Sequence, residues 1–161
     1  MKAIWTAVAA LGLVGCAATM DEQALAPAQQ QPTPQQIVAA RQTAFHLTGA
    51  AMGNMRAAAE RGGDVSGQAY AARGVARWAA VLPTMFPPST TAVTPSRAKP
   101  EIWTNRPDFD AKAAAFAAAV TRLAELAQAN DKEGFAAQHR ATAATCAACH
   151  DLYQVPQNRG G

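Results

Sequence analysis

The chain has 161 residues and a mass of 16.7 kDa, enough for one domain with a hydrophobic core. Its formal net charge of +3 and pI of about 9.0 are modest, and the basic residues are scattered, so we expect no nucleic-acid binding. Only 16% of the residues are charged and alanine is frequent, a composition that favours helices.

Residues 1–15 have the pattern of a signal peptide. Lys2 precedes an apolar run that ends at Val14, which is too short for a permanent membrane span. The run ends in Leu13-Val14-Gly15-Cys16, similar to the lipobox of bacterial lipoproteins, in which cleavage precedes an acylated cysteine. We expect export to the bacterial periplasm with Cys16 lipidated and the chain anchored to a membrane; ordinary cleavage with loss of Cys16 is the alternative.

Residues 16–33 are rich in Gln, Ala and Pro and lack apolar periodicity, which predicts a flexible tether. The folded domain is expected over residues 34–155, followed by a tail at 156–161. Thr33 is a candidate N-cap, Pro34 suits a first helical turn, and Gln36 can complete a capping box. A first helix is predicted to run to about Glu60 and to end at the glycines that follow.

A second helix is predicted over about residues 67–82, with Ala71, Val75, Trp78 and Leu82 buried. Residues 83–106 hold five of the chain's ten prolines, so we expect a long crossover without regular structure. A loop of this length needs a reason in a compact domain, and covering the edge of a cofactor is one. Trp103 is a candidate anchor for it, and plain core packing is the alternative role of this side chain.

The third helix has the clearest pattern, because apolar residues recur in steps of four and three from Phe109 to Ala127. A fourth helix is predicted to begin near Asp131 and to end before Pro156. Four helices without a strand signal predict an all-α fold, an antiparallel up-and-down four-helix bundle.

The last helix carries Cys146-Ala147-Ala148-Cys149-His150, the spacing that attaches a c-type haem. Residues at i and i+3 share a helix face, so both thiols can bond to one haem while His150 ligates the iron. A thioredoxin-like site would need a βαβ pattern, which the sequence lacks. A zinc site would need more ligands than this motif has, and the other histidines, His46 and His139, lack ligand-like spacing. One covalently attached haem c is therefore predicted.

A family resemblance rests on several of these features together. They are the Cys-Ala-Ala-Cys-His-Asp-Leu-Tyr run at 146–153, the Pro-Glu-Ile-Trp loop at 100–103, the Arg41-Gln42 pair and the Gly53-x-Met55 step. In this combination, from about residue 35 to 153, the chain resembles cytochrome c-prime, the class II c-type cytochromes. The resemblance implies that Arg41 and Gln42 contact the haem propionates and that Phe45 faces the distal side. It also implies a basic residue one turn beyond the haem histidine, where this chain has Gln154, and a possible homodimer through the first two helices.

Because a phenyl ring cannot ligate iron, Phe45 predicts a five-coordinate, high-spin haem that binds the diatomic gases nitric oxide and carbon monoxide, transfers single electrons, or does both. No catalytic acid, base or nucleophile stands out, so we expect no enzyme, and no redox partner is identifiable. One alternative is a six-coordinate, low-spin electron carrier, whose sixth ligand would be Met52 or another residue. The other is a haem-free thiol redox or metal-binding lipoprotein.

Overall fold

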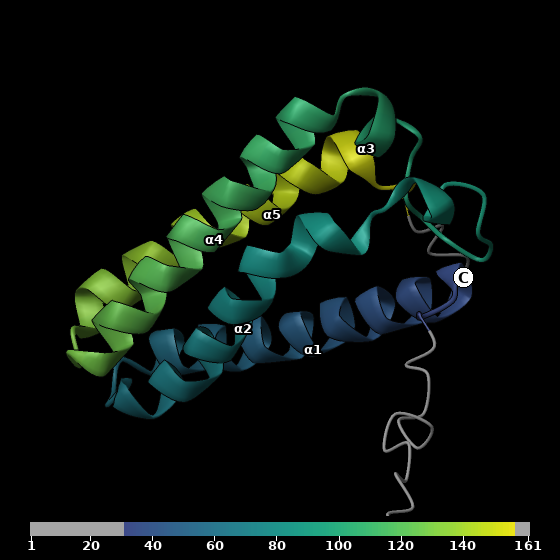
Figure 1. The fold of residues 1–161 in the computed structure, drawn as a ribbon. Helices are drawn as coiled ribbons and strands as arrows, with labels where there is room; N and C mark the ends of the chain where they lie inside the picture. The colour runs from purple at the N-terminus through teal and green to yellow at the C-terminus, as the bar shows by residue number, and fades with distance from the viewer. Residues whose placement is uncertain (1–30, 157–161) are drawn as a thin grey trace, which may run out of the picture. The chain divides into compact units, whose positions relative to one another are not determined.

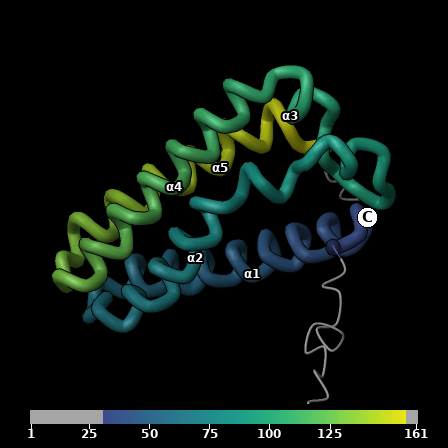
Figure 2. The backbone as a smooth tube through the Cα atoms, in the orientation of Figure 1, coloured from purple at the N-terminus to yellow at the C-terminus, as the bar shows by residue number. Residues whose placement is uncertain are grey.

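The computed structural model describes residues 31–156, which form a bundle of four long helices (Figure 1). Each long helix packs against the next one along the chain, and the last packs against the first, as the tube in Figure 2 lets the reader follow. The predicted antiparallel four-helix bundle is thus confirmed. The predicted signal peptide, Cys16 and nearly all of the tether lie outside the described residues. The helices are α1 Pro34–Arg61, α2 Ala69–Val81, the short α3 Glu101–Thr104, α4 Arg106–Gln128 and α5 Lys132–Tyr153.

The ends of the helices follow the signals in the sequence. The Thr33 hydroxyl accepts from the Gln36 amide at 3.2 Å, and the Gln36 side chain accepts from the Thr33 amide at 2.8 Å, which confirms the capping box. Gly62 ends α1 with φ of 65°, a left-handed conformation that glycine adopts without strain. Asp131 caps α5 by accepting from the Gly134 amide at 2.9 Å. No helix within residues 31–156 is long and apolar enough to cross a membrane.

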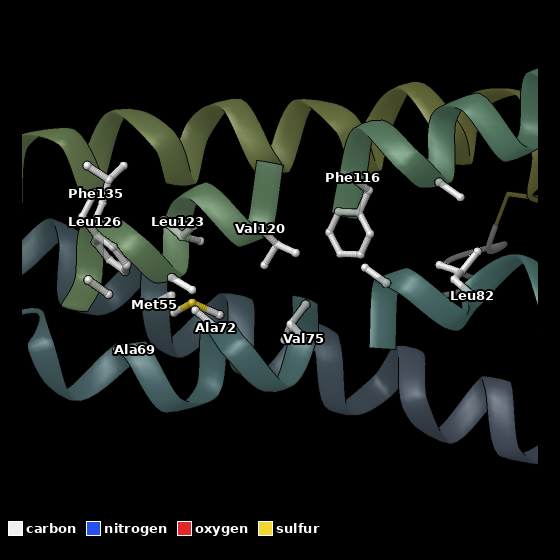
Figure 3. Packing of buried hydrophobic residues seen from close by; sticks show 14 of the residues in the cluster. Met55, Ala69, Ala72, Val75, Leu82, Phe116, Val120, Leu123, Leu126 and Phe135 are labelled. Carbon is white, nitrogen blue, oxygen red and sulfur yellow. The ribbon is translucent and has the colours of Figure 1, made fainter. Parts of the chain in front are cut away.

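The hydrophobic core lies between α2, α4 and α5, and Figure 3 shows its packing around Met55 of α1. The predicted seam of α4 is buried at every position: Phe109, Ala113, Phe116, Val120, Leu123 and Ala127. The predicted face of α2 was partly wrong, since Ala71 and Trp78 are only half-buried. The buried face of this helix consists of small residues, which let α2 approach α4 closely: Ala69, Ala72, Val75 and Ala79.

The crossover between α2 and α4 is more regular than predicted. It contains two 3₁₀ turns, at Leu82–Met85 and Pro88–Thr90, the short α3, and an isolated antiparallel bridge between Ala98 and Gln154. Prolines fix φ near the value that such turns need, so the proline-rich sequence forms tight turns rather than an open loop. Trp103 anchors the segment as predicted, because its indole N–H donates to the carbonyls of Phe86 and Pro87 at 3.1 and 3.2 Å.

Candidate functional site

A cavity of about 780 Å³ lies among α1, the first half of α4, the second half of α5 and the crossover. Its walls are mostly apolar, with Leu82, Phe86, Ile102 and Phe116 among the lining residues. All predicted site residues within the described part of the chain line this one cavity: Arg41, Gln42, Phe45, Cys146, Cys149 and His150. The bundle therefore brings together two groups of residues that are about a hundred positions apart in the sequence.

The wall formed by α5 carries the attachment motif. Cys146 and Cys149 are half-buried free thiols, and burial raises the pKa of both. His150 lies on the same helix and is only partly buried. This partial burial of its ring, followed by the positive charge of Arg97, lowers its pKa, whereas Asp151 raises it. A lowered pKa favours the neutral imidazole, which is the form that ligates a metal.

Tyr153 fixes the last turn of this helix against α4. Its hydroxyl donates to the Asp108 carboxylate at 2.5 Å, and its ring packs edge-on against Phe109 with centroids 5.3 Å apart. Burial and the Asp108 carboxylate together raise the pKa of Tyr153 to about 12. His150 precedes Tyr153 by three residues, so these contacts also hold the turn that carries the predicted iron ligand.

The wall formed by α1 carries a buried cation. The side chain of Arg41 is only 2% exposed and donates to the Met85 carbonyl and the Thr90 hydroxyl at 3.1 Å each, and to the Ser96 hydroxyl at 3.2 Å. Its guanidinium also lies 4.2 Å from the centre of the Phe86 ring. Burial lowers the pKa of Arg41, and no carboxylate within residues 31–156 forms an ion pair with it. Arg41 is therefore not a solvated side chain on the face of the helix.

Gln42 and Phe45 lie beside Arg41 on the same helix. The Gln42 side-chain amide donates to the Pro95 carbonyl at 3.0 Å, so it too bonds to the crossover. Phe45 is half-buried and meets Trp78 edge-on at 5.6 Å and Phe86 at 6.5 Å. The contact of Arg41 and Gln42 with haem propionates and the distal position of Phe45 stay predictions.

Several lining residues were missed from the sequence, among them a buried histidine and an arginine. His139 is only 8% exposed, and its Nε2 lies 3.0 Å from the Met52 carbonyl; because a carbonyl only accepts, Nε2 must carry a hydrogen. The apolar stripe of α5 could have revealed this histidine, since it lies seven residues before Cys146 on the same helix face. Arg97 gave no signal because it lies in the crossover, where no helical period predicts which way a side chain points.

The described residues fit a c-type haem. Two free thiols and an imidazole share one wall of a largely apolar cavity, and another wall carries a buried guanidinium that has no carboxylate partner among residues 31–156. The haem contains two carboxylates that could neutralise such a cation. Residues 31–156 hold no group of three or more His, Cys, Asp or Glu side chains suited to a bare metal ion. The haem-free metal-binding alternative is therefore without support in this part of the chain.

Comparison with known proteins agrees with this geometry. The family model for Cytochrome C' matches residues 36–154. A cytochrome c' of Alcaligenes xylosoxydans xylosoxydans is 32% identical over 126 residues, which cover 75% of this chain and 94% of the relative. The crystal structure of cytochrome c' from Rubrivivax gelatinosus matches 78% of this chain and all of its own with a TM-score of 0.72 and 29% identity. The structure of a ferrous variant of cytochrome c prime from Alcaligenes xylosoxidans with bound NO matches 80% of this chain and all of its own, with a TM-score of 0.71 and 26% identity. The chain therefore belongs to the cytochrome c' family and carries covalently attached haem c.

Proposed function

We propose that this chain is an exported monohaem cytochrome with a five-coordinate, high-spin iron, which binds nitric oxide or carbon monoxide and passes single electrons. The observation that carries the proposal is the cavity in which the attachment motif of α5 meets Phe45, a side chain that cannot ligate iron. When bound, the haem supplies an iron that takes a diatomic ligand and changes its oxidation state by one electron. We propose a carrier or gas binder rather than an enzyme.

The residues of α5 would hold the group. Each of Cys146 and Cys149 would contribute a sulfur for a thioether bond, and the three-residue spacing puts both on one helix face. His150 would contribute a ring nitrogen as an iron ligand, and its lowered pKa keeps the lone pair of that nitrogen available. The contacts of Tyr153 keep this turn in place.

Arg41 and Gln42 would hold the polar edge of the haem. A buried guanidinium without a counter-ion is unfavourable, and a propionate carboxylate in the same cavity would compensate its charge. Arg41 uses only part of its donor capacity in the three bonds to the crossover, since a guanidinium has five N–H groups.

Phe45 would restrict what reaches the distal side. Its ring and its aromatic neighbours Trp78 and Phe86 give this part of the cavity an apolar surface, which favours small neutral ligands over charged ones. The relative solved with bound NO supports gas binding at a site of this kind. In the Phe45→Ala variant we expect faster association of carbon monoxide, and the control variant Thr43→Ala, at an exposed position of α1 that does not line the cavity, should leave the rate unchanged.

The optical spectrum of the purified protein tests the proposal directly. We expect high-spin bands in the ferric and ferrous forms that shift when carbon monoxide or nitric oxide is added. Low-spin spectra that ignore carbon monoxide would contradict the five-coordinate assignment.

Met52 supports a second candidate, the six-coordinate electron carrier, because its half-buried thioether lines the same cavity. Met52→Leu discriminates between the two candidates, since it removes the only sulfur of this side chain while nearly conserving its volume. If Met52 ligates the iron, the variant turns from low-spin to high-spin; if it does not, the spectrum stays as in the parent. Met55→Leu is the matched control, because Met55 is fully buried in the core and does not line the cavity.

Export and lipid anchoring rest on residues 1–16 and are proposed from the sequence pattern alone. We expect the mature chain in the membrane fraction with an N-terminal mass that includes acyl groups at Cys16. The Cys16→Ser variant should lose both the acyl mass and the membrane fractionation. An unmodified N-terminus at another residue would show ordinary cleavage instead.

A homodimer through α1 and α2 is likewise proposed. Leu47 of α1 and Tyr70 of α2 are large apolar side chains that are 67% and 84% exposed, as expected of an interface that a second copy covers. Light scattering should give twice the chain mass for the parent and the single mass for Leu47→Glu. A monomeric parent would contradict the proposal.

A further inference from the structure

The crossover reaches the haem-bearing end of α5 through residues 97–99. Ala98 pairs with Gln154 in the antiparallel bridge, the Val155 amide donates to the Arg97 carbonyl at 2.8 Å, and the Lys99 amide donates to the Tyr153 carbonyl at 3.0 Å. These backbone bonds fix the register between the two segments. The crossover therefore holds its side chains at set positions beside the last turn of α5.

Two of these side chains are cations. The Arg97 Nε donates to the Val155 carbonyl at 2.9 Å, so both the backbone and the side chain of Arg97 bond to the same residue. The Lys99 ammonium donates to the Asp151 carbonyl at 3.1 Å. Arg97 lines the cavity together with His150, whereas Lys99 does not. A half-buried arginine held in this way keeps its charge at a fixed place relative to His150.

The charge of Arg97 lies on the same side of the cavity as the predicted iron ligand. Arg97 and His150 line this cavity together, and the Arg97 side chain bonds to Val155, five residues beyond His150. Gln154, on the same turn of chain as these contacts, is neutral. The positive charges on this side of the cavity therefore come from Arg97 of the crossover and Lys112 of α4, and none comes from α5 itself.

We propose that Arg97 tunes the reduction potential of this site. Its fixed positive charge beside His150 disfavours the ferric state and thereby raises the reduction potential. The inference rests on the proposed single-electron function of the same cavity. The physical reason is electrostatic: oxidation adds one positive charge at the iron, and a nearby cation makes that addition less favourable.

The test is potentiometric titration of the haem-loaded parent and four variants. Arg97→Gln and Arg97→Met remove the charge, Arg97→Lys keeps it, and Arg140→Gln removes an equal charge from an exposed position ten residues before His150 on the same helix. In both neutral variants we expect the ferric-to-ferrous ratio at a fixed potential to rise about threefold, an effect typical of a partly screened unit charge. At about 59 mV per tenfold change, this corresponds to a reduction potential that is about 28 mV lower than in the parent. Arg97→Lys and Arg140→Gln should stay at the parent potential.

The other outcomes separate this inference from the proposed function. A parent without reversible reduction would overturn the single-electron function itself. If the parent is reduced reversibly, two results would overturn only the role of Arg97. One is that Arg97→Gln has the same reduction potential as the parent, and the other is that Arg140→Gln lowers the potential as much as Arg97→Gln does. A fall in Arg97→Lys as large as in the neutral variants would assign the effect to the bond with Val155 rather than to charge. If only the charged versions load haem, Arg97 acts in assembly and the proposal is likewise overturned.

Discussion

Arg41 is the residue whose replacement tests the site most directly, because it joins α1 to the crossover from inside the molecule. Its side chain, 2% exposed, bonds to Met85, Thr90 and Ser96 and stacks over Phe86 at 4.2 Å. The Arg41→Gln variant removes the charge and at least two of the three bonds. We expect a less stable fold with a loosened crossover.

The magnitude follows from these contacts. A net contribution of about 1–1.5 kcal/mol for each of the three bonds and about 1 kcal/mol for the cation–π contact gives about 4–5.5 kcal/mol. Glutamine can recover about one bond, and removing a buried charge relieves its desolvation, so the expected loss is about 2–3 kcal/mol.

Denaturant unfolding of the haem-loaded protein, followed by far-UV circular dichroism, measures this loss as a lower midpoint at unchanged slope. Arg77→Gln is the control, since Arg77 is exposed on α2, and it should change the stability by less than about 0.5 kcal/mol. If Arg41→Gln were no less stable than Arg77→Gln, the bonds from Arg41 to the crossover would contribute nothing, and the reasoning would be refuted.

Other variants test the remaining contacts. Tyr153→Phe should lose about 1–2 kcal/mol at neutral pH, because the Asp108 carboxylate loses its buried donor. Since the folded pKa of Tyr153, about 12, lies above the ordinary value of about 10, the parent should lose this stability as the pH rises from about 10 to 12, and the variant should not; equal alkaline profiles would contradict the assignment. Gly134→Ala should lose about 1 kcal/mol, because its Cβ would lie 2.5 Å from Oδ2 of Asp131, whose other carboxylate oxygen, Oδ1, caps the helix. Gly74 lies in a helix, and a Cβ added there has no atom within 4 Å, so Gly74→Ala should raise the free energy of unfolding by about 0.5–1 kcal/mol. The melting temperatures of the two alanine variants should therefore move in opposite directions.

Local patterns in the sequence were sufficient for the helices and the attachment site. The capping box at Thr33, the cap at Asp131 and the seam of α4 depend on residues within a few positions of one another, so the helical period alone places them. The attachment motif is equally local, because its two thiols and its imidazole lie within five residues of one helix.

Tertiary structure decided what surrounds the motif. The bonds of Arg41 reach residues 44 to 55 positions further along the chain, and the bond between His139 and Met52 spans 87 positions. Arg97 reaches the last turn of α5 only because the crossover folds into turns and pairs with residues 154–155. Such contacts depend on the register between distant segments, which is set by the packing of the whole bundle and leaves no periodic signal in the sequence.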